Sequence, residues 1–151
     1  MEVKFVADVH LGKLARLLRM LGFDTAYRND SALMELLITS DEETRIFLSR
    51  NASLSKTHPG LCFIVTDEDA LVQLKQVVQQ FELKNHFQPF SRCMVCNGVL
   101  DNVPKESIAH LLQKNTAGYF DQFWQCRDCR RIYWKGSHYE RMLKTIENIV
   151  N

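Results

Sequence analysis

The sequence contains no long hydrophobic segment, and this excludes a membrane-spanning helix of ordinary length. No apolar run approaches the ~18 residues that such a helix needs. Residues 1–4 also lack the basic region, apolar core and cleavage site of a secretory signal. We therefore expect a soluble, cytoplasmic protein that does not act at a membrane.

Internal repeats, low-complexity tracts and a strong net charge are also absent. The 19 Lys and Arg residues against 18 Asp and Glu give a formal net charge of +1. With 151 residues, of which 46% are hydrophobic, the chain is long enough for one ordinary globular domain. A smaller, metal-stabilised module can be attached to such a domain.

The charges are unevenly distributed along the chain. Residues 1–90 hold ten Lys and Arg and twelve Asp and Glu, whereas residues 91–151 hold nine and six. Aromatic residues lie among the cations of this basic second part. Cations neutralise phosphates and aromatic rings stack on bases, so the pattern suits nucleic acid. A solvated face whose aromatic rings belong to the core remains the alternative.

Four of the five cysteines form two C-x2-C pairs, and this spacing predicts a zinc site. The pairs are Cys93 with Cys96, and Cys126 with Cys129. Two such turns supply the four thiolates of a tetrahedral zinc site, and four protein ligands leave no open position, so the ion is expected to be structural. Two disulfides, or four reduced cysteines buried as small hydrophobes, are the alternatives; a reducing cytosol favours zinc.

The residues around the cysteines refine this expectation. Asn97-Gly98 after the first pair supplies a residue able to take a positive φ, whereas no glycine follows the second pair. The first knuckle is therefore expected to be the more regular. Cys62 lies in the apolar run 61–65 and is expected to be a buried structural thiol.

Strands and helices alternate over residues 1–89, which predicts an α/β domain with a parallel sheet between two helical layers. The expected strands and helices are, in chain order, strand 3–8, helix 13–21, strand 23–27, a helix from Asp30-Ser31, strand 45–49, strand 61–65 and helix 68–81. Pro89 marks the expected boundary. A ribbon-like module at 90–151 is expected to carry the cysteine pairs, a helix over 104–113 and a closing helix over 139–149.

The helix at 13–21 carries an apolar stripe, which leaves Lys13, Arg16 and Arg19 on a basic flank. Lys13 and Arg16 are suited to holding backbone phosphates, as is Arg50 at the end of a strand. Ordinary solvation of a helix flank is the alternative for Lys13 and Arg16.

Acidic and amide residues follow the predicted strands. Asp8 follows the first strand, Asp30 the second, Asn51 the third, and Asp67 with Asp69 the fourth. The carboxyl ends of parallel strands meet at one edge of a sheet, where oxygen ligands suit Mg²⁺ or Mn²⁺. Asp30 and Asp67 have an alternative use as caps of the helices that follow them.

Several segments resemble the Mut-seven-type C-terminal RNase domain family. They are residues 5–8, 11–19, 21–25, 89–98, 123–126 and 133–142. The strings Pro-Phe-Ser-Arg-Cys at 89–93 and Gly-Ser-His-Tyr-Glu-Arg at 136–141 are the most specific. The resemblance covers nearly the whole chain and implies a PIN-like nuclease domain, residues 1–89, followed by a C-terminal zinc ribbon, residues 90–151.

This resemblance also implies a catalytic metal site. Asp8 would be its first acidic ligand, Asp30 its second and position 51 its third. The aspartate usual at position 51 is Asn51 here, and the acidic residue usual at position 33 is Leu33. A neutral amide keeps an oxygen ligand but loses a charge, which weakens divalent-ion binding. Asp67 can replace the charge lost at position 51 if the strand before Asp67 ends close to Asp8.

The resulting hypothesis is a ribonuclease that uses Mg²⁺ or Mn²⁺ to hydrolyse RNA phosphodiester bonds, with a zinc ribbon that helps to hold RNA. The expected catalytic residues are Asp8, Asp30, Asn51 and Asp67. The expected RNA contacts are Lys13, Arg16, Arg50, Arg131, Tyr133, Trp134, Lys135 and His138. For His138 there are two alternatives: it contacts RNA, or it lies beside Ser137, which caps the last helix. Two rivals remain: an RNA-binding or adaptor protein with weakened cleavage, and an interaction module whose ribbon docks a protein partner.

Overall fold

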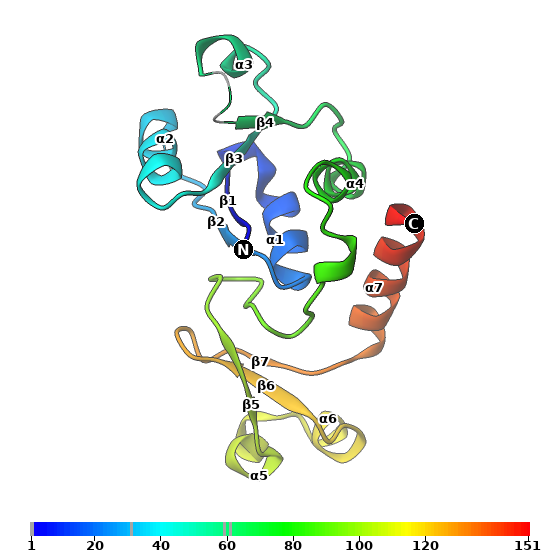
Figure 1. Cartoon of the computed structure of the whole chain (residues 1–151). Coiled ribbons are helices and arrows are strands. Elements are labelled where there is room, and N and C mark those ends of the chain that lie inside the picture. The colour runs from blue at the N-terminus through cyan, green and yellow to red at the C-terminus, as the bar shows by residue number, and fades with distance from the viewer. Residues whose placement is uncertain (1, 31, 59, 61) are drawn as a thin grey trace.

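A computed structural model describes residues 2–30, 32–58, 60 and 62–151, and a parallel sheet forms the centre of its first half (Figure 1). The four strands lie in the order β2-β1-β3-β4, and all pairs are parallel. The bounds of these strands are β1 (Lys4–Ala7), β2 (Asp24–Ala26), β3 (Ile46–Ser49) and β4 (Cys62–Ile64). The predicted parallel α/β sheet is therefore present, although Leu61, at the predicted start of the fourth strand, lies outside the described residues.

Helices cover both faces of this sheet. They are α1 (Gly12–Met20), α2 (Leu33–Glu42), α3 (Leu54–Thr57) and α4 (Ala70–Gln80), with short 3-10 turns η1 (Val9–Leu11) and η2 (Lys84–His86). Successive strand side chains point to opposite faces. Phe5, Ala7 and Leu48 pack with residues of α1 and α4, whereas Val6 and Phe47 pack with residues of α2 and α3.

Helix starts in the first half differ from the predictions. Asp69 begins α4, because its Oδ1 accepts hydrogen bonds from the N–H groups of Leu71 (2.8 Å) and Val72 (3.3 Å). Asp67 is therefore not the cap. α2 begins without a side-chain cap, and Asp30 forms an ion pair with Arg28 at 3.2 Å instead. Ser31, the predicted start of this helix, lies outside the described residues.

The second half contains a small antiparallel sheet in the order β5-β6-β7. Its strands are β5 (Leu100–Val103), β6 (Phe123–Cys126) and β7 (Ile132–Tyr133), and α5 (Lys105–Ile108), η3 (Ala109–Leu111) and α6 (Lys114–Tyr119) connect the first two. The predicted helix over 104–113 is present in part: α5 is followed directly by the 3-10 turn η3, which ends at Leu111. Ile108 is buried but Leu111 is exposed, so no continuous apolar stripe supports a longer helix.

The closing helix α7 (Ser137–Val150) returns to the first half and packs beside α4 (Figure 1). Its Ile146 and Val150 are buried in the same hydrophobic core as α1 and α4. The helix begins two residues before the predicted start, after Gly136 and without a side-chain cap, so Ser137 does not cap it. The division into 1–89 and 90–151 stays a prediction, because α7 shares the core of the first half.

A buried arginine joins α1 to the first cysteine knuckle. The Arg19 side chain is only 4% exposed. Its Nε donates to the Thr25 carbonyl oxygen (2.9 Å), and its Nη1 donates to the carbonyl oxygens of Met94 (3.2 Å) and Val95 (3.1 Å). The prediction that Arg19 lies on an exposed basic flank is wrong, since helical periodicity could not show that the ribbon covers this side of α1.

The edge strand β2 holds the same knuckle through its side chains and backbone. Asn97 Nδ2 donates to Asp24 Oδ1 (2.7 Å), and Asn97 Oδ1 accepts from the Thr25 N–H (3.0 Å). Arg45 pairs with Asp24 at 2.8 Å. Burial raises the pKa of the Asp24 carboxyl, but the hydrogen bonds from Arg45 and Asn97 outweigh burial and hold this pKa below its usual range.

Three stacked aromatic rings join the small antiparallel sheet to α7. Phe90 lies between Trp124, at 4.1 Å between ring centroids, and Tyr139, at 4.3 Å. The Tyr139 hydroxyl donates to the carbonyl oxygen of Met20 in α1 (3.1 Å). The ribbon, α7 and α1 are thus in direct contact. No helix among the described residues is long and apolar enough to cross a membrane.

We expect Arg19→Met to lower the free energy of unfolding by about 2–4 kcal/mol, because it removes hydrogen bonds from a charged donor to buried carbonyl groups. Urea denaturation of the zinc-loaded protein measures this change. Arg16→Met, at an exposed position of the same helix, is the matched control and should change stability by less than about 0.5 kcal/mol. Equal stability of the two variants would contradict the role given to Arg19.

Candidate functional site

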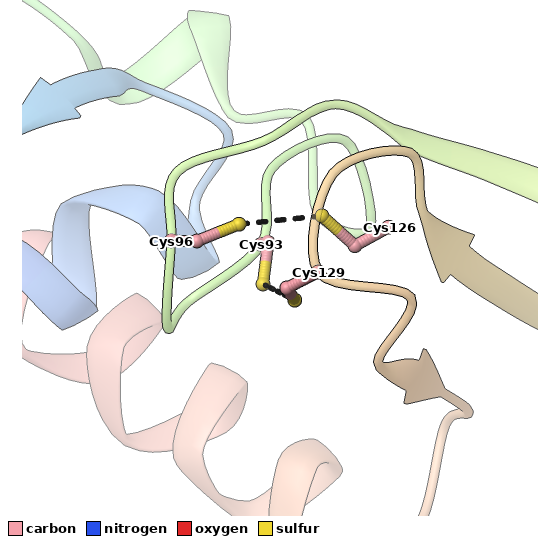
Figure 2. Close-up of side chains that lie close together, drawn as sticks. All are labelled: Cys93, Cys96, Cys126 and Cys129. Carbon is pink, nitrogen blue, oxygen red and sulfur yellow. Dashed lines mark hydrogen bonds between the residues drawn. The ribbon is translucent and has the colours of Figure 1, made fainter.

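The four paired cysteines gather at one point between the two knuckles (Figure 2). The Sγ atoms of Cys93 and Cys129 lie 3.7 Å apart, and those of Cys96 and Cys126 lie 3.4 Å apart. All four sulfurs lie within 4.8 Å of one another. A tetrahedral zinc ion with Zn–S bonds of about 2.3 Å requires sulfurs about 3.8 Å apart. The cysteines are free thiols, so they form no disulfides, and the cluster fits a zinc ion.

The two knuckles have the same backbone geometry. In the first, the Cys93 N–H donates to the Gly98 carbonyl oxygen (2.8 Å); in the second, the Cys126 N–H donates to the Arg131 carbonyl oxygen (2.9 Å). The residue after each pair has a positive φ, 70° at Asn97 and 68° at Arg130. The prediction of a less regular second knuckle is wrong, because an arginine takes the left-handed conformation there.

A glycine is required at residue 98 because there is no room for a Cβ atom there, and not because a positive φ is needed. A Cβ atom at this position would lie 2.7 Å from Cys126 Sγ, 2.7 Å from Asp128 Oδ2 and 3.2 Å from Cys96 Sγ. A side chain at residue 98 would therefore push two of the four sulfurs apart. This requirement is invisible in the sequence, where Gly98 looks like an ordinary turn residue.

Tyr133 contacts the cluster of four cysteines from one side. Its hydroxyl donates to Cys93 Sγ (3.1 Å) and accepts from the Met94 N–H (3.1 Å). Burial raises the pKa of the Cys93 thiol, but hydrogen bonds from Tyr133 and the nearby backbone outweigh burial and lower this pKa to about 7. The proposed RNA contact of Tyr133 can use only its half-buried ring, since its hydroxyl is already bound.

Cys62 lies apart from the zinc cluster. Its half-buried side chain packs against the core residues between the sheet and α2 and α3. Burial raises the pKa of this thiol. These properties are those of a structural thiol.

A second candidate site lies where the strand order reverses between β1 and β3. In open parallel sheets, ligands bind at this point outside the carboxyl ends of the strands. Asp8 follows β1, and its N–H donates to the Leu48 carbonyl oxygen (2.9 Å). The hydroxyl of Ser49, at the end of β3, donates to Asp8 Oδ2 (2.8 Å) and accepts from the Asn51 N–H (3.0 Å). Asp8, Ser49 and Asn51 therefore lie together.

Sequence reasoning missed Ser49 as a residue of this site. Its side chain is fully buried, and its hydroxyl fixes one carboxylate oxygen of Asp8. The other carboxylate oxygen accepts from the Val9 N–H (2.7 Å). The sequence does contain one indication of this role, because Ser49 is a polar residue at the end of an otherwise apolar strand.

The remaining predicted catalytic residues have other local partners. Asp30 lies in an exposed turn beside Arg28. Asp67 Oδ1 accepts from the Asp69 N–H (2.8 Å). In the described part of the chain, the four cysteines are the only group of three or more Cys, His, Asp or Glu side chains that could share an ion. The carboxylates of Asp8, Asp30 and Asp67 do not form such a group there.

Three of the predicted RNA-binding residues line one pocket of about 580 Å³. Lys13 and Arg16 reach it from α1, and His138 reaches it from the start of α7, more than 120 residues later. His138 also lines a smaller pocket of about 220 Å³ with Tyr133 and Trp134. The structure therefore brings together three polar side chains that the sequence could not relate to one another. Arg50, Arg131 and Lys135 are exposed elsewhere.

The family model of the Mut7-C RNAse domain matches residues 3–146, nearly the whole chain. The protein belongs to this family, as the resemblance in its sequence predicted, and membership indicates a ribonuclease-type function with RNA as the substrate. Comparisons with curated proteins and with solved structures each gave no match.

We expect Gly98→Ala to weaken zinc binding by at least about tenfold, because the added methyl group displaces sulfurs that must share one ion. Competition with a chromogenic zinc chelator measures the affinity. Gly118→Ala is the matched control, since a Cβ at Gly118 meets no atom within 4 Å. Zinc retention by Gly98→Ala equal to that of the control would contradict the assigned role of Gly98.

Proposed function

We propose that this protein is a PIN-like ribonuclease that hydrolyses RNA phosphodiester bonds with Mg²⁺ or Mn²⁺ at the carboxyl edge of its parallel sheet. The observation that supports this proposal is the linked set of Asp8, Ser49 and Asn51 at the point where the strand order reverses. Family membership supplies the class of reaction.

The donor atoms at this edge fit a hard cation. Mg²⁺ is usually held by one or two carboxylates and keeps several waters, so it does not need three carboxylates in direct contact. Asp8 supplies one carboxylate and Asn51 one amide oxygen. Asp30, which the resemblance implies as the second acidic ligand, and Asp67, expected in a supporting position, have other local partners in the structure. When bound, the ion supplies an activated water and stabilises charge on the reacting phosphate.

The protein's own side chains orient the reactants. The hydrogen bonds from Val9 and Ser49 fix the plane of the Asp8 carboxylate. Lys13 and Arg16, exposed on the helix that follows Asp8, hold phosphates of the RNA chain, and Arg50 does so beyond β3. The structural zinc keeps the ribbon folded, and Arg131, Trp134 and Lys135 of the ribbon assist RNA binding.

An RNA-binding protein with weakened cleavage is the second candidate, and Asn51 is the observation that favours it. Its Oδ1 accepts from both the N–H (3.2 Å) and the hydroxyl (2.6 Å) of Ser53. An uncharged oxygen that already has two partners is a weaker ligand for a divalent cation than a free carboxylate.

We expect Asp8→Asn to reduce Mn²⁺-dependent cleavage of labelled RNA by at least about 100-fold, since it removes the carboxylate at the centre of the site. RNA affinity should change much less. Asp121→Asn, at an exposed site on the ribbon, is the control and should cleave like the unmodified protein. Binding without cleavage in the unmodified protein would instead support the second candidate.

We expect Asn51→Asp to raise the cleavage rate by about tenfold or more, because it adds a charge at the metal site. The aspartate can still accept both hydrogen bonds from Ser53, so the local fold should be retained. Initial rates over a Mn²⁺ titration measure the change, with Asn102→Asp on β5 as the control. An unchanged rate and an unchanged Mn²⁺ dependence would count against position 51 as a ligand.

A further inference from the structure

A pocket that carries both positive and negative side chains lies between α1, the start of α4, α7 and the first knuckle. It measures about 580 Å³, within the range of about 300–1,000 Å³ typical of small-molecule sites. Its apolar lining includes Leu17, Met20, Leu71, Met94, Tyr139 and Met142. Lys13 and Arg16 supply its positive side, Glu68 and Asp69 supply its negative side, and His138 adds an imidazole ring.

We propose that this pocket binds one nucleotide of the RNA chain, with the base inside and the adjoining phosphate against Lys13 and Arg16. This proposal rests on the proposed function and names a binding subsite for its substrate. The apolar and acidic lining suits the base of a nucleotide, and the cations Lys13 and Arg16 suit its phosphate.

The lining has the chemistry of a base-binding site. Methionine side chains are flexible and make favourable sulfur–aromatic contacts, so Met20, Met94 and Met142 can adapt to a flat ring. Tyr139 adds an aromatic surface, and protein rings commonly stack on the bases of single strands. Glu68, which is exposed at the pocket, can accept hydrogen bonds from the N–H groups of a base.

The charges argue against a simple fatty or apolar ligand. Lys13 and Arg16 are exposed cations on successive turns of α1, the arrangement expected for holding a backbone phosphate. Glu68 and Asp69 would repel the carboxylate of an amphipathic acid, but they suit the hydrogen-bond donors of a base. Asp69 Oδ1 is already used as the cap of α4, so Glu68 is the freer of the two.

The pocket adjoins the proposed cleavage site along the chain. α1, which carries Lys13 and Arg16, begins four residues after Asp8, and the residues that open α4 directly follow Asp67. Both walls therefore extend from the carboxyl edge of the sheet. An RNA strand that crosses this edge can place one nucleotide in the pocket while a neighbouring phosphodiester lies at Asp8.

The zinc ribbon builds the remaining walls. Met94 lies inside the first knuckle, between two zinc-binding cysteines, and Arg19 holds its carbonyl oxygen. His138, Tyr139 and Met142 come from α7, the closing helix of the second half. The docked ribbon thus has a direct role in forming the pocket for RNA.

The experiment measures binding of a fluorescent oligoribonucleotide to zinc-loaded protein in an Asp8→Asn background, which prevents cleavage. We expect Met142→Trp, which fills the pocket, to weaken binding by about tenfold. Val72→Trp places the same side chain at an exposed position of α4 outside the pocket and should change affinity less than twofold. An abasic oligomer of equal length should bind more weakly than RNA and be insensitive to Met142→Trp.

A surface variant provides a second test that does not perturb the core. We expect Arg16→Glu to weaken RNA binding about tenfold and to reduce its salt dependence, whereas Arg141→Glu, exposed on α7 outside the pocket, should have a smaller effect. Equal effects within both variant pairs, or equal affinity for abasic and ordinary oligomers, overturn the subsite. Cleavage that depends on Asp8 would then still support the ribonuclease, and a pocket-dependent affinity without any cleavage would support the subsite alone.

Discussion

The buried guanidinium of Arg19 is the contact on which the relation between the two halves depends. It lies on the ribbon-facing side of α1 and donates to β2 and to two carbonyl groups of the first cysteine knuckle. Burial lowers the pKa of this group, yet its usual pKa is so high that it stays charged. A buried cation with several carbonyl acceptors is strongly directional, so it fixes where the knuckle sits on α1.

The first cysteine knuckle is held in two ways, by its place in the cysteine cluster and by hydrogen bonds to α1 and β2. The ion would hold the sulfurs of residues 93–96 together, while Arg19 and Asn97 hold the backbone of this segment against α1 and β2. Met94 lies between the cysteine cluster and these hydrogen bonds, and its side chain lines the pocket beside α1. The cysteine cluster and the pocket beside α1 are therefore built by the same segment.

Much of the fold could be predicted from the sequence, because apolar periodicity and turn residues are local signals. The alternation of strands and helices around the parallel sheet was predicted, with ends that differ by one or a few residues. The candidate sheet-edge site was predicted less completely. The position of Asp8 at the end of β1 follows from the pattern, but the partners of Asp8, Asp30 and Asn51 depend on turn geometry that single residues do not specify.

By itself the sequence determined the four cysteines that cluster and fit a zinc ion, the α/β class and the family, because cysteine spacing, hydrophobic period and motif strings are properties of short segments. Only the tertiary structure decided that Arg19 is buried, that Tyr133 donates to Cys93, and that Lys13 and Arg16 share a pocket with His138. These outcomes depend on how α7 and the ribbon pack against α1, and contacts between segments so far apart along the chain leave no periodic signal in either segment.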